Sequence, residues 1–391
     1  MRSIITKGDE HMNKLDVLLG CIDFEENFDN EHYPRAISRL ALTLILEEST
    51  TQNIKFNEVK KIPKTLHTET EILEFLLNDV SVTEKERSGF VSLAFAIFTY
   101  AKGIDLAKAT DLSLSMNMEA IRGELGAFDD RLHSLGRPYA GQISSASNTR
   151  RLLENSEMTT EKGRLGYGYD KGPRCQDAIS YRAAPQTHGG VRDNLDFLRR
   201  TIEESLEKGA VNPYQLKYAL DAVMIGFADL GNISERRSFR LTDSHLSYGL
   251  PTNLVYENPG FNHGFPVIQA VGTAVLGELK TLALPTRLYG GKSSYIPTLV
   301  SGFKVVSALE LLSKVIAVEV FMSAQGMELL KKEMETFSFG KGTSAAFEKL
   351  RTSVGVVKEN RYVIPDLLES DKLIISGDLV AYVENKIGKL E

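Results

Sequence analysis

The chain has 391 residues, of which 42% are hydrophobic and 25% charged, a composition typical of a globular protein with a sizeable core. Its formal net charge of −6 argues against nucleic acid or an anionic membrane as the partner. The two cysteines, Cys21 and Cys175, have no CxxC spacing and the histidines form no HExxH pattern, so no metal, disulfide or cofactor is expected. Residues 1–8 lack the apolar core of a signal peptide, and we therefore expect a cytoplasmic protein.

The first part of the chain alternates helical patterns with loops. Residues 1–33 form a polar, variable segment, and apolar residues recur at helical spacing after Pro34. Residues 49–85 suggest loops and short strands, and residues 155–175 suggest one loop. The glycines of that loop follow no strand and precede no Lys-Ser/Thr, which argues against a phosphate site. Between these segments the pattern predicts three helices, at 86–106, 111–125 and 144–154.

The second part is dominated by long helices. A helix is expected to begin at Pro213, and two more are expected over 262–284 and 297–333. The last would span about 37 residues, or roughly 55 Å. Its apolar middle, 305–322, carries three charged residues, which indicates a buried helix and not a membrane span. We predict an all-α bundle of long helices, buried further by oligomerisation, in one domain with a central bundle at 176–333 and a C-terminal helical segment at 334–391.

Residues 176–190, QDAISYRAAPQTHGG, resemble the Gln-Asp-x-Tyr-Ser-x-Arg-x-x-Pro-Gln segment of the histidine/phenylalanine ammonia-lyase family. Further matches follow in family order between residues 34 and 366, among them Phe128-Asp129, Gly141-Gln142, the Ser-Glu-Arg-Arg run at 234–237 and Gln325-Gly326. The resemblance implies an all-helical fold of the aspartase/fumarase-like superfamily. It also implies a tetramer whose active sites are shared between subunits.

The resemblance breaks at the catalytic positions. Family enzymes carry an electrophile, methylidene-imidazolone (MIO), cyclised from Ala-Ser-Gly, but the matched position here reads Phe28-Asp29-Asn30 and no Ala-Ser-Gly occurs elsewhere. Ile179 stands at the essential tyrosine, and Lys292 lies near the position of the active-site glutamate. A further catalytic tyrosine belongs to a portion that precedes the matched region. We therefore expect a shortened member of the family without MIO.

Six residues are candidates for a surviving site. The resemblance assigns substrate binding to Gln176, Arg182 and Gln186, with Arg182 as the carboxylate ligand; the alternative for Arg182 is a salt bridge between helices. Tyr181, His188 and Lys292 are candidate replacement acids or bases if burial shifts their pKa values. The alternative is that all three are structural or surface residues.

Two functions remain open on the sequence. One is a MIO-independent lyase acting on a small carboxylate-bearing, amino acid-like substrate. The other is a non-catalytic subunit or small-molecule-binding scaffold, pairing with a lyase-like chain that supplies the missing portion. Either would form a homo-oligomer, expected to be a tetramer, or a hetero-oligomer.

Overall fold

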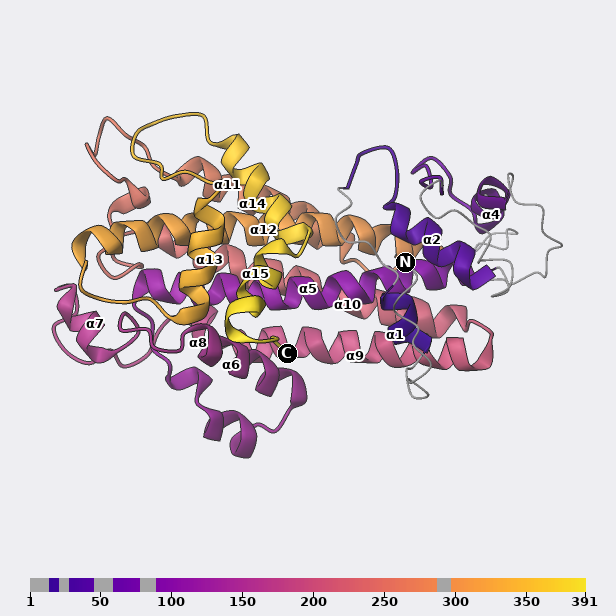
Figure 1. Cartoon of the computed structure of the whole chain (residues 1–391), viewed down its shortest axis with the longest axis horizontal. Coiled ribbons are helices and arrows are strands. Elements are labelled where there is room, and N and C mark those ends of the chain that lie inside the picture. The colour runs from indigo at the N-terminus through magenta and orange to yellow at the C-terminus, as the bar shows by residue number, and fades with distance from the viewer. Residues whose placement is uncertain (1–13, 21–27, 46–58, 78–88, 287–296) are drawn as a thin grey trace. The chain divides into compact units, whose positions relative to one another are not determined.

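The computed structural model describes residues 14–20, 28–45, 59–77, 89–286 and 297–391 (Figure 1). Within these ranges the regular structure is helical, and pairing of extended backbone is limited to two isolated bridges, His32 with Pro63 and Pro259 with Asn262. The predicted all-α class is confirmed. The helix predicted over 297–333 has the bounds Pro297–Glu333, and the helix predicted to begin at Pro213 does so.

The chain divides into two compact units, which are described separately. Unit 1 consists of residues 1–101, 195–222 and 285–306, and unit 2 of residues 102–194, 223–284 and 307–391. Four long helices contribute residues to both units: α5 (Phe90–Ile121), α9 (Ala184–Lys208), α10 (Pro213–Leu241) and α12 (Pro297–Glu333). The single helical domain stays a prediction.

Unit 1 is built around an aromatic cluster. The rings of Tyr33, Phe95 and Phe303 lie with their centroids 5.0 to 5.3 Å apart, two of the three pairs edge to face, a favourable arrangement for aromatic side chains. Besides the parts of the long helices, its elements are α1 (Lys14–Leu19), α2 (Arg35–Ile45) and α4 (Glu69–Leu77).

Helix α4 corrects the prediction of loops and strands over residues 49–85. A capping box begins it: the Glu71 amide donates to Thr68 Oγ1 at 3.2 Å, and the Thr68 amide donates to Glu71 Oε2 at 2.9 Å. This Thr-x-x-Glu signal is present in the sequence. The remaining parts of that stretch, 49–58 and 78–85, lie outside the described residues.

Unit 2 contains the other helices. The shorter ones are α6 (Ala140–Leu152), α7 (Glu161–Gly166), α8 (Ile179–Arg182), α11 (Pro266–Leu282), α13 (Lys341–Arg351), α14 (Ile364–Ile375) and α15 (Asp378–Ile387), with single turns at Gly126–Phe128, Leu132–Gly136 and Thr252–Leu254. Helix α7 corrects the prediction of one loop over 155–175. The Thr160 side chain caps it by accepting from the Gly163 amide at 3.1 Å.

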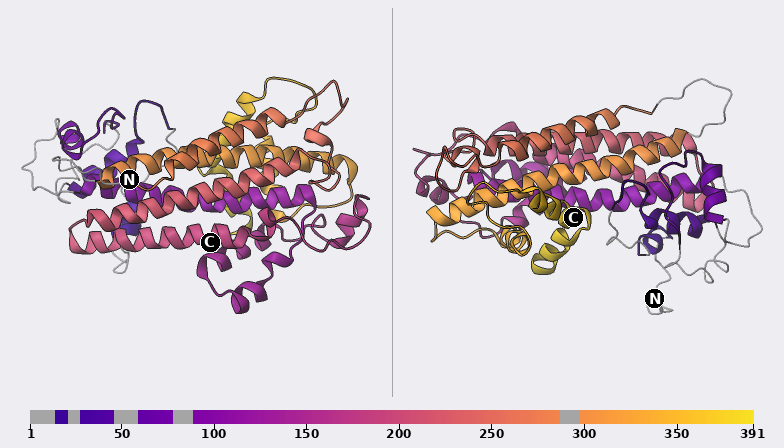
Figure 2. Two further views of the ribbon diagram at one scale, coloured as in Figure 1. Left: turned by 180° about the vertical axis from the view of Figure 1, so that it is seen from behind. Right: turned by 90° about the horizontal axis from the view of Figure 1, so that it is seen from above.

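Small residues let the long helices of unit 2 approach closely. A Cβ on Gly231 of α10 would lie 3.0 Å from Leu279 of α11, and Figure 2 shows α10, in rose, beside the orange α11 and α12. A Cβ on Gly141 of α6 would lie only 2.2 Å from the Gly189 carbonyl oxygen of α9. Backbone approach at that point therefore requires glycine.

Helix α5 is one element of 32 residues, where the sequence predicted two helices. Among the described helices it is the one whose composition and length would suffice to cross a membrane, but 78% of its most apolar window is buried inside the protein, as in a core helix. Two lysines of this helix have partners far away in the sequence. Lys102 Nζ donates to the Ile375 carbonyl at 2.8 Å, and Lys108 pairs with Glu384 at 2.8 Å.

The second half of α5 carries a run of fully buried polar side chains: Thr110, Asp111, Ser113, Ser115, Asn117 and Glu119. Glu119 accepts from the Gly340 amide at 2.7 Å, from Thr343 Oγ1 at 2.8 Å and from Ser156 Oγ at 2.7 Å. Burial raises the pKa of Glu119 from 4.5 to about 7, although these hydrogen bonds oppose the shift.

We expect Glu119 to make folding pH-dependent. A carboxyl whose pKa is raised in the folded state stabilises fully below its unfolded pKa of 4.5, and this contribution is lost as the pH rises towards 7. The loss amounts to about 3 kcal/mol. In Glu119→Gln the free energy of unfolding should therefore fall less between pH 4.5 and 7 than in the wild type. Urea denaturation at several pH values measures this, with the exposed Glu154→Gln as control; parallel wild-type and Glu119→Gln curves would exclude the effect.

Candidate functional site

The one-turn helix α8 divides the predicted site into two faces. Ile179 is 65% exposed and Arg182 lies on the same exposed face, while Ser180 and Tyr181 are buried. This division follows from helical geometry, because residues three apart share a face and residues two apart do not. Gln176, just before the helix, is also exposed. Among the residues that the structure describes, no carboxylate forms an ion pair with Arg182, so the alternative of a salt bridge has no support from this structure.

Buried side chains fix this turn from both sides. Arg174 pairs with Asp170 at 2.7 Å and with Asp177 at 2.9 Å, and its guanidinium lies 3.4 Å from the centre of the Tyr248 ring. The other Asp177 oxygen accepts from the Glu124 amide at 2.6 Å. The segment carrying Gln176 is therefore anchored by charge-assisted hydrogen bonds.

Arg237 of α10 anchors the helix itself. Its Nη1 donates to the Ser180 carbonyl at 3.2 Å, while its Nε and Nη2 donate to Glu319 of α12 at 2.5 and 2.8 Å. Both side chains of this ion pair are 0% exposed. Ser113 and Ser234 also donate to Glu319, so every charged oxygen has a partner.

Tyr181 belongs to the core. It is 1% exposed, and its hydroxyl donates to Asn117 Oδ1 of α5 at 2.7 Å. Burial raises the pKa of Tyr181 far above its ordinary value, so the phenol stays protonated at neutral pH. In this position Tyr181 joins α8 to α5 and does not reach the exposed face with Arg182.

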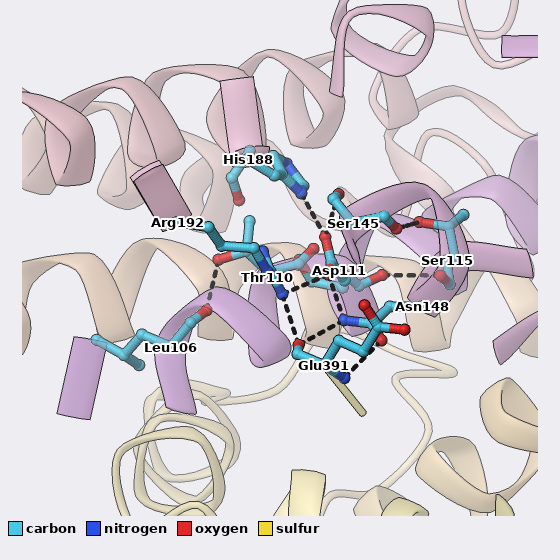
Figure 3. Close-up of polar contacts among 12 residues, drawn as sticks. Leu106, Thr110, Asp111, Ser115, Ser145, Asn148, His188, Arg192 and Glu391 are labelled. Carbon is cyan, nitrogen blue, oxygen red and sulfur yellow. Dashed lines mark hydrogen bonds and ion pairs between the residues drawn. The ribbon is translucent and has the colours of Figure 1, made fainter. Parts of the chain in front are cut away.

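His188 belongs to a second buried cluster, the Asp111 cluster, formed by Asp111, Ser145, Asn148, His188 and Arg192 (Figure 3). The His188 Nδ1–H donates to Asp111 Oδ1 at 2.8 Å, and Arg192 Nη2 donates to Asp111 Oδ2 at 2.7 Å. Burial lowers the pKa of His188 despite the neighbouring carboxylate. Burial alone would raise the pKa of Asp111, but Arg192 and His188 hold it below its ordinary value. A neutral imidazole and an ionised carboxylate result.

The C-terminal residues cover the Asp111 cluster (Figure 3). Asn148 Nδ2 donates to the Glu391 carbonyl at 2.8 Å, and the Glu391 amide donates back to Asn148 Oδ1 at 2.9 Å. Arg192 Nη2 donates to the same carbonyl at 3.2 Å, and Arg151 donates to the carbonyls of residues 387–389. The His188 side chain is 0% exposed, so in this chain it is not open to solvent.

Of the two remaining candidates, Gln186 lies within the described residues and Lys292 does not. Gln186 is half-buried; in the amide orientation that satisfies both groups, its nitrogen donates to the Ala183 carbonyl at 3.2 Å and its oxygen accepts from Arg137. In the described ranges no group of three or more His, Cys, Asp or Glu side chains is placed to hold a metal ion.

The structure thus places Gln176 and Arg182 at the surface of one anchored turn and puts Tyr181 and His188 in two separate buried networks. Sequence reasoning missed Asp111, Asn117 and Arg192, which are the partners of those buried groups. Asp111 and Asn117 had one signal available, namely that polar residues alternate with apolar ones in an otherwise apolar helix.

Comparison with known proteins places this arrangement in a family. Residues 38–352 match the family model described as aromatic amino acid lyase. The histidine ammonia-lyase of Alkaliphilus oremlandii is 30% identical over 339 residues, and that of Streptomyces coelicolor is 31% identical over 339 residues. Each alignment covers 80% of this chain but 64% of the relative, so the chain spans less than two thirds of the length of these curated relatives.

Solved structures show the same fold. The histidine ammonia-lyase of Trypanosoma cruzi superposes with a TM-score of 0.72 at 21% identity, covering 95% of this chain and 81% of that one. The tyrosine aminomutase of Streptomyces globisporus gives a TM-score of 0.71 at 21% identity, covering 94% and 74%. The long-helix architecture and the sequence match over most of its length lead to one conclusion: the chain belongs to the aromatic amino acid lyase family.

Proposed function

We propose that this protein binds a small carboxylate-bearing, amino acid-like molecule through Arg182 and has no MIO of its own. The observation that carries the proposal is the exposed guanidinium of Arg182 on a turn held by the Arg237–Glu319 and Arg174–Asp177 pairs. A guanidinium fork matches a carboxylate in two parallel hydrogen bonds, and an anchored backbone presents that fork with little loss of conformational entropy. Gln176 and Gln186 are the amides proposed to assist it.

The residues at the MIO position support the second half of the proposal. Cyclisation needs a serine that loses water and a glycine that can bend, and Phe28-Asp29-Asn30 offers neither. Asp29 is instead engaged with its neighbours: its carboxylate accepts from the Glu31 amide at 2.9 Å and from Lys61 Nζ at 3.1 Å. Burial by itself would raise the pKa of Asp29, but these hydrogen bonds and that of the His32 amide lower it to about 2.

Intact mass tests this half. We expect the purified protein to have the mass of its encoded sequence, because no tripeptide suited to cyclisation is present. The protein alone should also form neither urocanate from histidine nor cinnamate from phenylalanine, since the electrophile and the tyrosine base are both replaced. A mass lower by two water molecules, or steady release of either product, would refute this.

Two modes of action fit the family, and the burial of Tyr181 and His188 favours one of them. A MIO-independent lyase needs an acid or base beside the substrate, and the described candidates both lie in the core. Lys292 remains the candidate base for this mode. We favour the other mode, in which the chain is a subunit of a homo- or hetero-oligomeric, lyase-like assembly and presents Arg182 to a site completed by a neighbouring chain.

Replacement of Arg182 tests the binding site. Losing an ion pair to a bound carboxylate typically costs 2–5 kcal/mol, so Arg182→Ala should weaken binding by roughly 30-fold or more. Histidine, phenylalanine, tyrosine, urocanate and cinnamate can be screened by thermal shift, and the affinity of any stabilising compound then measured by calorimetry. Arg200→Ala, which removes another exposed arginine, is the matched control. A compound that binds both variants as tightly as the wild type would contradict the assignment.

Co-expression distinguishes the two modes. The partner to co-express is a lyase-like chain that carries Ala-Ser-Gly but lacks the family's Gln-Asp-x-Tyr-Ser-x-Arg-x-x-Pro-Gln segment. In the subunit mode this chain should co-purify with the protein, and the complex should form product that neither chain forms alone. That gain should disappear with Arg182→Ala. If this protein, without any second chain, forms product from a carboxylate substrate other than histidine or phenylalanine and its Lys292→Ala variant does not, the MIO-independent mode is correct.

A further inference from the structure

A cavity of about 600 Å³ lies within unit 2, outside the Arg182 turn. Three segments line it: the end of α7 with the residues after it (166–169), the loop after α10 (249–256), and the last turns of α12 (329–334). The volume is within the range of sites for small molecules, about 300–1,000 Å³. We call it the tyrosine cavity, because Tyr167, Tyr169 and Tyr256 are among its walls.

The backbone of the loop is strained at residues adjacent to those that line the cavity. Tyr248, Asn253 and Leu254 have φ angles of +57°, +59° and +56°, a region that side-chain-bearing residues seldom adopt and that is especially unfavourable for bulky ones. Gly249, at φ +98°, lets the Tyr169 ring approach, since a Cβ there would lie 2.8 Å from that ring. Backbone strain of this kind concentrates at sites that hold ligands.

The rings of the cavity are held in place by polar contacts. The Tyr167 hydroxyl donates to the Gly249 carbonyl at 3.0 Å, and the guanidinium of buried Arg122 lies 3.9 Å from the centre of its ring. The Tyr169 hydroxyl is 3.3 Å from His245 Nδ1, and 40% of Tyr169 stays exposed. Aromatic faces fixed in this way can stack against a flat molecule without first being ordered.

The charges of the cavity favour an anion. Lys332 Nζ lies 4.8 Å, and Lys358 Nζ 5.9 Å, from the centre of the Tyr256 ring. These two ammonium groups come from different segments and converge on one ring; Lys332 lines the cavity, Lys358 lies beyond its lining, and Glu333 is the one acidic lining residue. From the rings, the lysines and the strained loop together, we infer that the tyrosine cavity is a second binding site, for a planar aromatic anion.

A pair of fluorescent probes tests this inference. Anilinonaphthalene sulfonate is an aromatic anion with a planar naphthalene ring system, and phenylnaphthylamine has the same rings without the charge. The chain contains no tryptophan, so the probe signals are read without interference from that fluorophore. Wild-type protein should bind the sulfonate at one saturable site more tightly than the neutral probe.

Two variants and two controls identify the site. Lys332→Gln should weaken sulfonate binding about three- to fivefold, the effect of removing a partly exposed ion pair, and leave the neutral probe unaffected. Tyr256→Leu should weaken the binding of both probes, because both stack on its ring.

Two controls accompany these variants. Lys331→Gln changes the neighbouring lysine, which lies 5.7 Å from the Phe347 ring instead, and should have no effect. Arg182→Ala should also leave the sulfonate site intact, which separates this inference from the proposed function. Unchanged affinity in both Lys332→Gln and Tyr256→Leu, or an equal loss in Lys331→Gln, overturns it.

Discussion

Replacing Arg237 with methionine is expected to lower the free energy of unfolding by about 3–5 kcal/mol, the typical cost of removing one member of a buried ion pair. Glu319 would keep its hydrogen bonds from Ser113 and Ser234 but would be left as an uncompensated charge at 0% exposure. The Ser180 carbonyl would also lose its donor, which should loosen α8. Urea denaturation measures the first effect, and hydrogen exchange of the amides of residues 179–184 measures the second.

Arg236 provides the matched control. It adjoins Arg237 and pairs with Glu235, but its side chain is 51% exposed. Arg236→Met should therefore cost less than about 1 kcal/mol. The double variant Arg237→Met/Glu319→Leu should recover much of the loss, because a buried ion pair is often replaceable by apolar side chains of similar volume. Equal losses in the free energy of unfolding for Arg236→Met and Arg237→Met would show that the buried ion pair contributes no more to stability than the exposed one.

The second large effect is expected for Asp111→Asn, again about 3–5 kcal/mol, because the neutral amide leaves Arg192, whose side chain is only 9% exposed, without its carboxylate. Ser145 and Asn148 also lose part of their acceptor. Since Asn148 and Arg192 hold Glu391 as well, the variant should release the C-terminal residues. Trypsin should then cleave after Lys386 and Lys389 faster than in the wild type.

Asp196→Asn is the control for this prediction, because Asp196 lies near the cluster in sequence and is 49% exposed in its pairs with Arg199 and Arg200. It should change stability by less than about 1 kcal/mol and leave tryptic cleavage unaltered. Adding Arg192→Met to Asp111→Asn should restore part of the stability, since it removes the unpaired cation. A wild-type rate of tail cleavage in Asp111→Asn would mean that the tail is held independently of the cluster.

The long helices were predictable because their signals are local. Helix α12 has an apolar middle, a proline at its first turn and no interruption, and it was predicted to the residue. Helix α5 was predicted as two pieces, 86–106 and 111–125, but it is one helix, in which Lys102 and Lys108 contact α14 and α15. Their partners, Ile375 and Glu384, are more than 270 residues away, and no local pattern contains them. The short helices α4 and α7 were missed because their main sequence signal is an N-capping residue, and not a helical periodicity of apolar residues.

The candidate site shows the same limit. Helical geometry explains why Ile179 is exposed while Tyr181, two residues later, is buried. What each side chain meets could not be predicted, because His188 depends on a carboxylate 77 residues earlier and Tyr181 on an amide 64 residues earlier. Their roles as acid or base were inferred from residue type, whereas burial and partners decide the protonation state.

The buried polar side chains of α5 have a consequence for the divergence of this protein. Asp111, Asn117 and Glu119 of α5 each form a hydrogen bond with a different segment of the chain. A shift of α5 along its axis would therefore leave several buried polar groups unpaired at once. A change at one of these positions is tolerable when its partner changes too. Among homologues, position 111 should therefore vary jointly with 188 and 192, and position 117 with 181, so that paired substitutions record the contacts of this helix across the family's history.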